Sequence, residues 1–299
     1  MLAPNPEMVQ PEDWNNQDKT SHTTPVFLIH DGGGTTFAYH CLDPLDRYVY
    51  GIHNPYFRTG QVFDGGLPQM ARLYSAWIKQ TVAKRSFPVK RKNVDGSINI
   101  LLGGWSLGGF LSMEVARQLA EDRLVRVVGI LMVDSMFPGR VKEIPWEDID
   151  AAQDKARQHF YEIEDEDVEE ERSLSTKARE NNQVLSQRCM AEATKMVAKW
   201  KLPEWTGKLH GKRPKAILLR ATQNMPTVSG GVVSLDMDRE DKMLGWAEYD
   251  KDMFEQVIDV AGHHFDLFAP DRVDNTCQAI KQGLDKLDRL AQLAVNDFV

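Results

Sequence analysis

The sequence has few cysteines and no excess of basic residues. Its three cysteines, Cys41, Cys189 and Cys277, are widely spaced and form no Cys-x-x-Cys pair, so neither a disulfide framework nor a zinc knuckle is predicted. The formal net charge of −8 and the lack of long basic tracts argue against nucleic acid as the main partner. We therefore expect free thiols in a reducing compartment, and so a cytoplasmic protein.

Targeting and membrane segments are missing as well. Residues 1–24 are polar and contain proline, without the basic start and apolar stretch of a signal peptide, and no later apolar run is long enough to cross a bilayer. The histidines show no metal-ligand spacing such as H-E-x-x-H. We expect a flexible N-terminal arm over residues 1–24, no cofactor, no metal, no membrane contact and a monomeric protein.

From residue 25 onwards, short apolar runs alternate with helical patterns. Strand patterns occur in the run that begins at Ile98 and at residues 25–30, 48–53, 127–133, 215–222 and 257–260. Apolar residues recur at three- and four-residue spacing over 67–84 and 110–119, and a final helix is predicted over 271–293. Fully apolar strands that alternate with helices predict an α/β fold, with a mostly parallel sheet and helices on both faces.

Residues 138–214 interrupt this alternation. The segment is highly charged and mainly helical in composition, contains no convincing strand, and carries a dense acidic run at 162–172. The acidic run fits a solvated helix face or a surface loop better than a metal or partner site. We interpret 138–214 as an insertion within one domain that spans residues 25–299.

The strand that begins at Ile98 leads into Gly104-Trp105-Ser106-Leu107-Gly108, which matches the G-x-S-x-G nucleophile elbow. In this motif the serine occupies a strained turn, and side chains at the two glycines would collide with the neighbouring strand and helix. Such a short match is weak alone. Here it lies between an apolar strand and an amphipathic helix, which is the context that the motif requires, so Ser106 is the candidate nucleophile.

An acid for this serine is expected further along the chain, because α/β-hydrolases use the order serine, acid, histidine. Asp134 ends the next strand at the carboxyl edge of the sheet, where ligand chemistry gathers. The following strand leads into residues 221–224, which contain no carboxylate, so Asp134 is favoured. An aspartate at a strand end is otherwise often a turn former or a helix cap. Asp236 and Asp238 are the alternatives if Asp134 is not the acid.

Two adjacent histidines, His263 and His264, follow the last predicted strand. A serine hydroxyl needs an imidazole to accept its proton, and either ring could project from this loop, so composition leaves both as candidates. His30, at the end of the first strand, is better interpreted as a packed or hydrogen-bonded histidine at the edge of the site than as a catalytic one.

A glycine turn, Asp31-Gly32-Gly33-Gly34, follows the first strand. It lacks both the G-x-G-x-x-G spacing and the lysine of a P-loop, so an oxyanion hole fits better than a phosphate cradle. In the α/β-hydrolase arrangement the N–H of the residue after the nucleophile, here Leu107, acts with an N–H from an earlier loop, here that of Gly32 or Gly33.

Four segments together resemble the type I thioesterase family, and most closely the thioesterase domains that end fungal polyketide synthases and nonribosomal peptide synthetases: Phe27-Leu28-Ile29-His30 with the glycine turn, Gly-Trp-Ser-Leu-Gly-Gly, Val133-Asp134-Ser135 and Gly262-His263-His264-Phe265. The resemblance covers about residues 25–290 and implies an α/β-hydrolase fold. It implies the roles of acylated serine for Ser106, acid for Asp134 and base for His264, and a helical lid over 138–214 that controls entry.

The resemblance implies a serine thioesterase that releases an acyl or polyketide chain from a carrier-protein or CoA thioester, by hydrolysis or cyclisation. The alternatives are a carboxylesterase for small oxygen esters and a non-catalytic hydrolase-fold binding partner. An acyl carrier protein could meet basic residues at 84–85, 90–92 and 212–213, although solvated loops are the simpler interpretation. The chain begins at Met1 and shows no carrier-protein or condensation segment, so we expect a freestanding enzyme or an excised domain.

Overall fold

The computed structural model describes residues 4–11, 23–88, 93–140, 144–145, 147–149, 152, 169–228 and 230–296. Within these residues, seven strands form one sheet in the order β1-β3-β2-β4-β5-β6-β7. The strands are β1 (Glu7–Gln10), β2 (Val26–Ile29), β3 (Val49–Ile52), β4 (Ile98–Trp105), β5 (Val125–Val133), β6 (Lys215–Ala221) and β7 (Gln256–Val260). Every neighbouring pair is parallel except β1 with β3, which is antiparallel. The prediction of a mostly parallel sheet is confirmed.

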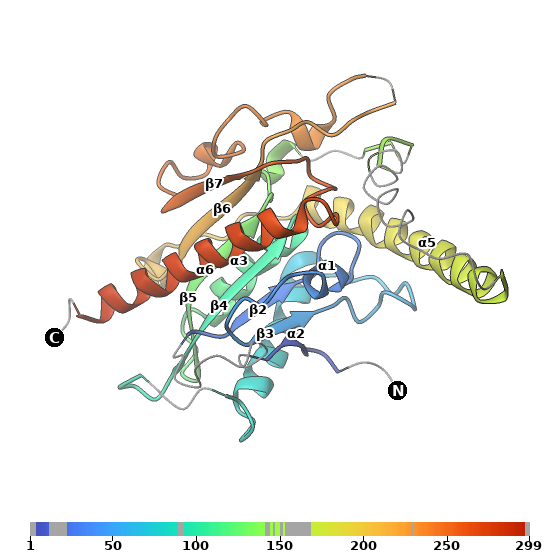
Figure 1. Cartoon of the computed structure of the whole chain (residues 1–299). Coiled ribbons are helices and arrows are strands. Elements are labelled where there is room, and N and C mark those ends of the chain that lie inside the picture. Colours follow the sequence, from blue (N-terminus) through green and yellow to red (C-terminus); the bar gives the residue numbers. More distant parts are fainter. Residues whose placement is uncertain are drawn as a thin grey trace.

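Helices cover both faces of this sheet (Figure 1). They are α1 (Phe37–His40), α2 (Gly66–Val82), α3 (Leu107–Leu119), α5 (Glu169–Lys199) and α6 (Val273–Asn296). Short 3-10 turns occur at η1 (Pro138–Arg140), η2 (Gly207–Leu209), η3 (Ser234–Asp236) and η4 (Trp246–Glu248). No helix in the described ranges combines the length and the apolar character needed to span a bilayer.

The alternation of side chains along the strands builds two cores, one on each face of the sheet. On β4, Ile100 and Leu102 join the core beneath α2 and α3, whereas Leu101 between them joins the core beneath α6. Leu284 and Leu287 on α6 are fully buried in that second core. These strands are apolar in consecutive positions because both of their faces are covered.

The N-terminal region differs from the expectation of a flexible arm over residues 1–24. Glu7–Gln10 forms β1, whose residues pair with β3, and the Gln10 side chain is buried and donates to the Leu42 carbonyl over 2.9 Å. Four residues with only two buried side chains are too short to show a strand pattern, so pairing to an existing edge creates this strand.

Residues 138–214 contain no strand in their described part, as predicted, and their main element is the long helix α5. This helix projects beyond the sheet at one end, and its C-terminal half returns to the body of the molecule (Figure 1). The acidic run predicted to be a solvated surface lies partly outside the described residues. The assignment of the whole segment as a lid remains a proposal.

Parallel pairing brings the candidate site residues to one edge of the sheet. Trp105 at the end of β4 pairs with Val133 at the end of β5, so Ser106 and Asp134 leave adjacent strands side by side. β7 ends at Val260, shortly before the two histidines, and β2 ends at Ile29, shortly before the glycine turn. All of these loops follow the carboxyl ends of strands, where α/β proteins bind ligands.

Candidate active site

The turn around Ser106 has the strained geometry of a nucleophile elbow. Ser106 has φ 54° and ψ −115°, a conformation that side chains other than glycine rarely adopt. A Cβ on Gly104 would lie 2.5 Å from the Ile29 carbonyl oxygen, and one on Gly108 would collide with the same atom. The Ser135 hydroxyl donates to the Ser106 carbonyl over 2.7 Å. The two glycines therefore allow β4 and α3 to approach β2 closely enough to hold this turn.

His264 connects Ser106 with Asp134. Its Nε2 lies 3.0 Å from Ser106 Oγ, and its Nδ1 lies 2.8 Å from Asp134 Oδ2. Because an ionised carboxylate can only accept, Nδ1 carries the proton and Nε2 is free to accept the serine proton. The ring of Trp105 lies 5.5 Å from the imidazole, and that of Phe265 lies 5.0 Å away at 90°, so both restrict its movement.

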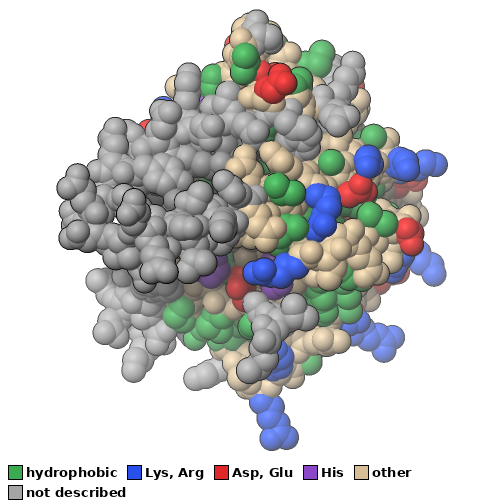
Figure 2. Space-filling model, turned by 90° about the vertical axis from the view of Figure 1, so that its right-hand side faces the viewer, with side chains coloured by type: hydrophobic (Ala, Val, Ile, Leu, Met, Phe, Trp, Pro, Cys, Tyr) green, Lys and Arg blue, Asp and Glu red, His purple; other side chains and the backbone are tan. Residues whose placement is uncertain are grey.

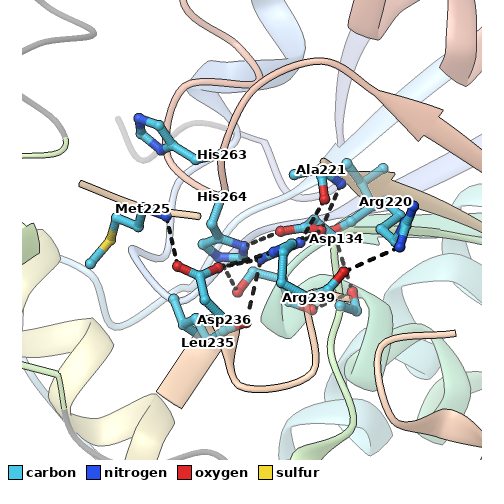
Figure 3. Close-up of polar contacts among 12 residues, drawn as sticks. Asp134, Arg220, Ala221, Met225, Leu235, Asp236, Arg239, His263 and His264 are labelled. Atoms are coloured by element: carbon cyan, nitrogen blue, oxygen red, sulfur yellow. Dashed lines mark hydrogen bonds and ion pairs between the residues drawn. The ribbon is translucent and has the colours of Figure 1, made fainter. Parts of the chain in front are cut away.

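The structure places His263, the other candidate base, outside the row of contacts that runs from Ser106 through His264 to Asp134. Its backbone N–H donates to Asp266 Oδ1 over 2.7 Å, and its Nε2 lies 3.4 Å from Asp266 Oδ2. Its Nδ1 accepts the backbone N–H of Phe265 over 3.2 Å. Figure 3 shows the two adjacent rings directed apart, with His264 toward Asp134. His263 thus orders the turn that carries His264.

The Asp134 carboxylate is buried and has three hydrogen-bond partners. Its Oδ1 accepts Arg239 Nη1 over 2.5 Å and the Ala221 N–H over 2.9 Å, while Oδ2 faces His264. Burial alone would raise the pKa of Asp134, but the hydrogen bond from His264 and the charge of Arg239 outweigh burial and lower the pKa to about 2. Asp134 is therefore ionised across the physiological pH range.

Sequence reasoning missed Arg239, which lies 105 residues after Asp134 in a segment without strand or helix pattern. It also left Asp236 and Asp238 as alternative acids. The structure brings Asp236 to Arg239, at 2.8 Å from Nη2, rather than to His264. A buried arginine is rare unless it is paired, but burial of Arg239 is not visible in the sequence, which offered no signal for this contact.

Of the predicted oxyanion residues, Gly32 and Leu107 line the same pocket as Ser106 and His264. Leu107 is the first residue of α3, where backbone N–H groups have no partner within the helix and the helix dipole favours negative charge. Gly33 does not line this pocket, and the Gly34 N–H donates to the Asp31 main-chain carbonyl over 3.1 Å. This geometry favours Gly32 over Gly33 as the second donor.

His30 holds the start of the glycine turn. Its Nδ1 lies 2.6 Å from the Asp31 carbonyl and its Nε2 lies 2.7 Å from the Tyr74 hydroxyl. Burial lowers the pKa of His30 to about 4, so the ring is neutral, donating from Nδ1 and accepting at Nε2. The interpretation as a hydrogen-bonded histidine at the edge of the site agrees with these contacts.

Asp31 brings a second carboxyl group into the Ser106 pocket. Burial raises the pKa of Asp31 to about 6, although the nearby His264 ring and the amide groups of Gly33 and Gly34 act in the opposite direction. The folded protein therefore holds this proton more tightly than the unfolded chain, in which the pKa is 3.8. Stability from this group is greatest below pH 3.8 and is lost as the pH rises through about 6.

Replacing Asp31 with asparagine is expected to raise Tm at pH 8 by about 2–5 °C, because the amide has nearly the same shape as the carboxylate and buries no charge. The gain should disappear near pH 4, where the wild-type carboxyl is protonated. Thermal unfolding of both proteins from pH 4 to pH 8 measures this, with the exposed Asp64→Asn as the control. A gain that is equal at all pH values would contradict the assignment.

The pocket above Ser106 has a volume of about 730 Å³ and a mostly apolar wall. Phe110, Met136 and Leu235 line it from the body of the protein, and Met190 and Val197 line it from α5. A second cavity, of about 470 Å³, shares Gly32, Leu107 and Ala193 with the first and is more polar. Among the described residues, no three His, Cys, Asp or Glu side chains gather as metal ligands.

A parallel sheet with helices on both faces, an elbow after β4 and the chain order Ser106, Asp134, His264 define an α/β-hydrolase. Residues 24–284 match the thioesterase domain family, and the chain belongs to it. It is 31% identical to a probable thioesterase, gloN, of Glarea lozoyensis, over 88% of this chain and 90% of that protein. The chain is accordingly a hydrolase of the thioesterase type.

Two further similarities extend this result. A stretch of 138 residues is 37% identical to the nonribosomal peptide synthetase imqB of Aspergillus flavus, covering 46% of this chain and 4% of the synthetase. The crystal structure of the NocB thioesterase domain in a covalent complex with a fluorophosphonate nocardicin G analogue superposes with a TM-score of 0.56 at 22% identity, over 89% of this chain and 96% of that one. The latter likeness confirms the fold.

Proposed function

We propose that this thioesterase acts through Ser106, Asp134 and His264 to release an acyl or polyketide chain from a carrier-protein or CoA thioester. The observation that carries the proposal is the continuous line from Ser106 Oγ to His264, at 3.0 Å, and on to Asp134, at 2.8 Å, at the floor of the pocket. This is the arrangement that turns a weakly nucleophilic hydroxyl into an attacking group.

In the first half of the reaction, Ser106 Oγ attacks the thioester carbonyl while His264 Nε2 takes its proton. The negative charge that develops on the carbonyl oxygen is met by the N–H of Leu107 and that of Gly32. Collapse of the tetrahedral intermediate breaks the C–S bond, and the imidazolium returns its proton to the departing thiolate. Asp134 stabilises the imidazolium in between, and the product is an acyl-serine ester with a free thiol.

In the second half, a hydroxyl-bearing or amine-bearing nucleophile attacks the acyl-serine carbonyl, and His264 takes its proton. Water gives a free acid, and a hydroxyl or amine of the acyl chain itself gives a ring. Breaking the bond from the carbonyl carbon to Oγ returns the proton to Ser106. The residues of α5 over the pocket, Met190 and Val197 among them, support a lid role for the 138–214 segment, since they cover the acyl-serine position.

A carrier-protein partner is proposed from the chemistry of the substrate and the similarity to a synthetase rather than from a basic surface. Lys212 pairs with Glu121 at 2.9 Å, and Arg213 pairs with Asp250. The stretch 90–92 lies outside the described residues. On the face shown in Figure 2, lysine and arginine side chains are spread among acidic, apolar and polar ones. This favours solvated loops for the paired residues.

Intact-mass measurement after incubation with a panel of acyl thioesters tests the proposal. Acyl-N-acetylcysteamine substrates with aliphatic chains are expected to add one acyl mass to the wild-type protein, because the pocket wall is apolar, and to add none to Ser106→Ala. Turnover of these thioesters should exceed that of aryl esters of the same chain. The reverse preference would indicate a carboxylesterase.

A fluorophosphonate probe distinguishes the proposed enzyme from the remaining alternative, a non-catalytic binding partner. Folded wild-type protein that neither forms an acyl adduct nor reacts with the probe at Ser106 would contradict the proposal and indicate a non-catalytic hydrolase-fold binding partner. Circular dichroism of the same sample establishes that the protein is folded. Comparison with Ser106→Ala identifies the labelled residue, because the variant retains every other hydroxyl group of the chain.

A further inference from the structure

The buried guanidinium of Arg239 lies between Asp134 and Asp236 and contacts the Asp134 oxygen that does not face His264 (Figure 3). Only 3% of this residue is exposed. Its Nη1 donates to Asp134 Oδ1 over 2.5 Å and to the Ala221 carbonyl over 3.0 Å. Nothing in the roles of nucleophile, base and acid accounts for a second buried charge at this place.

Asp236 holds the other side of the guanidinium. Its Oδ1 accepts Arg239 Nε over 3.0 Å and Nη2 over 2.8 Å, and its Oδ2 accepts the backbone N–H of Met225 over 2.7 Å. Asp236 is itself 4% exposed. Because the guanidinium is planar and its N–H groups point in fixed directions, these contacts leave it one orientation.

The two carboxylate oxygens of Asp134 therefore have different partners. Arg239 and the Ala221 N–H occupy Oδ1, so Oδ2 alone is directed at His264 Nδ1. A carboxylate on a strand end without such partners could rotate about its last side-chain bond, and each rotation would move the imidazole away from Ser106.

We propose that Arg239 is a positioning residue for thioester cleavage: it keeps Asp134 charged and turned so that Oδ2 meets His264, and Asp236 holds Arg239 for this task. The inference rests on the proposed function of Ser106, Asp134 and His264. Arg239 itself touches neither the pocket nor the reacting atoms and acts through Asp134.

The charges around Asp134 predict the direction in which its pKa changes when Arg239 is removed. The charged groups that face Asp134 are His264 and Arg239, and those that face Arg239 are Asp134 and Asp236. Asp31 acts on His264 and His263 lies within reach of Asp236. Without Arg239, two buried carboxylates would remain close together with one cation fewer. The pKa of Asp134 would then rise, and a neutral Asp134 cannot stabilise the imidazolium.

The test compares Arg239→Gln with wild-type protein in acyl-thioester hydrolysis from pH 5 to pH 9. We expect kcat to fall about 10- to 100-fold with KM changed by less than about threefold, since the pocket wall is intact. The acid limb of the kcat/KM profile should move up by about one pH unit or more. A merely structural arginine would lower Tm without moving this limb.

Two further variants separate charge from geometry and remain informative if Arg239→Gln does not fold. Arg239→Lys keeps the charge but not the fork, so kcat should fall while the acid limb stays near its wild-type position. Asp236→Asn, which frees the guanidinium from one side, should lower kcat less than Arg239→Gln does.

Arg220→Gln is the matched control. Arg220 donates to the backbone carbonyl of Arg239 over 3.1 Å and pairs with Asp259, but it does not contact Asp134. Its variant should keep the wild-type profile. Equal effects of Arg220→Gln and Arg239→Gln, or an unchanged acid limb and kcat in Arg239→Gln, would overturn the role of Arg239 and leave the proposed function in place. Wild-type protein without Ser106 acylation would overturn the proposed function as well.

Discussion

Replacing His264 with alanine is expected to lower kcat for acyl-thioester hydrolysis by about 10⁴- to 10⁶-fold. The imidazole is 3.0 Å from Ser106 Oγ, and no other described side chain is placed to take the serine proton. Steady-state hydrolysis measures the loss, and the rate of fluorophosphonate labelling should fall in parallel, because both reactions need the activated hydroxyl.

His263→Ala is the control for this prediction, because it removes the same side chain from the adjacent position. His263 faces Asp266 and the Phe265 N–H, so its loss should loosen the turn and leave kcat within about tenfold of wild type. If His263→Ala is the inactive variant and His264→Ala retains activity, the base has been assigned to the wrong histidine.

Replacing Asp134 with asparagine is expected to lower kcat by about 10⁴-fold while the protein stays folded. Two fixed donors, Arg239 Nη1 and the Ala221 N–H, surround the Oδ1 position, so the amide oxygen must occupy it. The amide nitrogen then faces His264 Nδ1 and donates to it. This forces the proton onto Nε2, where it points at Ser106 and prevents the ring from accepting the serine proton.

Asp238→Asn is the control for the Asp134→Asn prediction. Asp238 lies on the loop that carries Asp236 and Arg239 and was an alternative acid, so its amide variant should retain wild-type turnover. The comparison requires hydrolysis rates and Tm values for both variants. Full activity in Asp134→Asn would place the acid elsewhere, and a loss confined to Asp238→Asn would identify where.

The parts of the site that the sequence predicts are those encoded by neighbouring residues. An apolar strand, a glycine-flanked serine and an amphipathic helix are contiguous, so Ser106 follows from local pattern. Asp134 follows because a parallel sheet brings successive strand ends to one edge. The sequence supports the fold for the same reason, since fully apolar strands that alternate with helices have few stable arrangements.

The parts that could not be predicted depend on contacts between distant segments. Composition left His263 and His264 open, and the family resemblance favoured His264; the contact that distinguishes them is which ring faces Asp134. Arg239 reaches Asp134 across 105 positions from a loop with no periodicity. Strand β1 exists because the edge of β3 is available to pair with it, and only the folded loop shows that Gly32 rather than Gly33 lines the pocket with Ser106.

The positive φ angles at the site affect how this protein can evolve. Ser106, with φ 54°, and Asp134, with φ 44°, both hold backbone conformations that cost an L-residue about 1–2 kcal/mol each and cost glycine almost nothing. Glycine at position 106 would relieve this strain and remove the candidate nucleophile, whereas glycine at position 134 would leave the buried Arg239 guanidinium without its partner. On the proposed mechanism, selection for heat resistance and selection for turnover therefore oppose each other at Ser106.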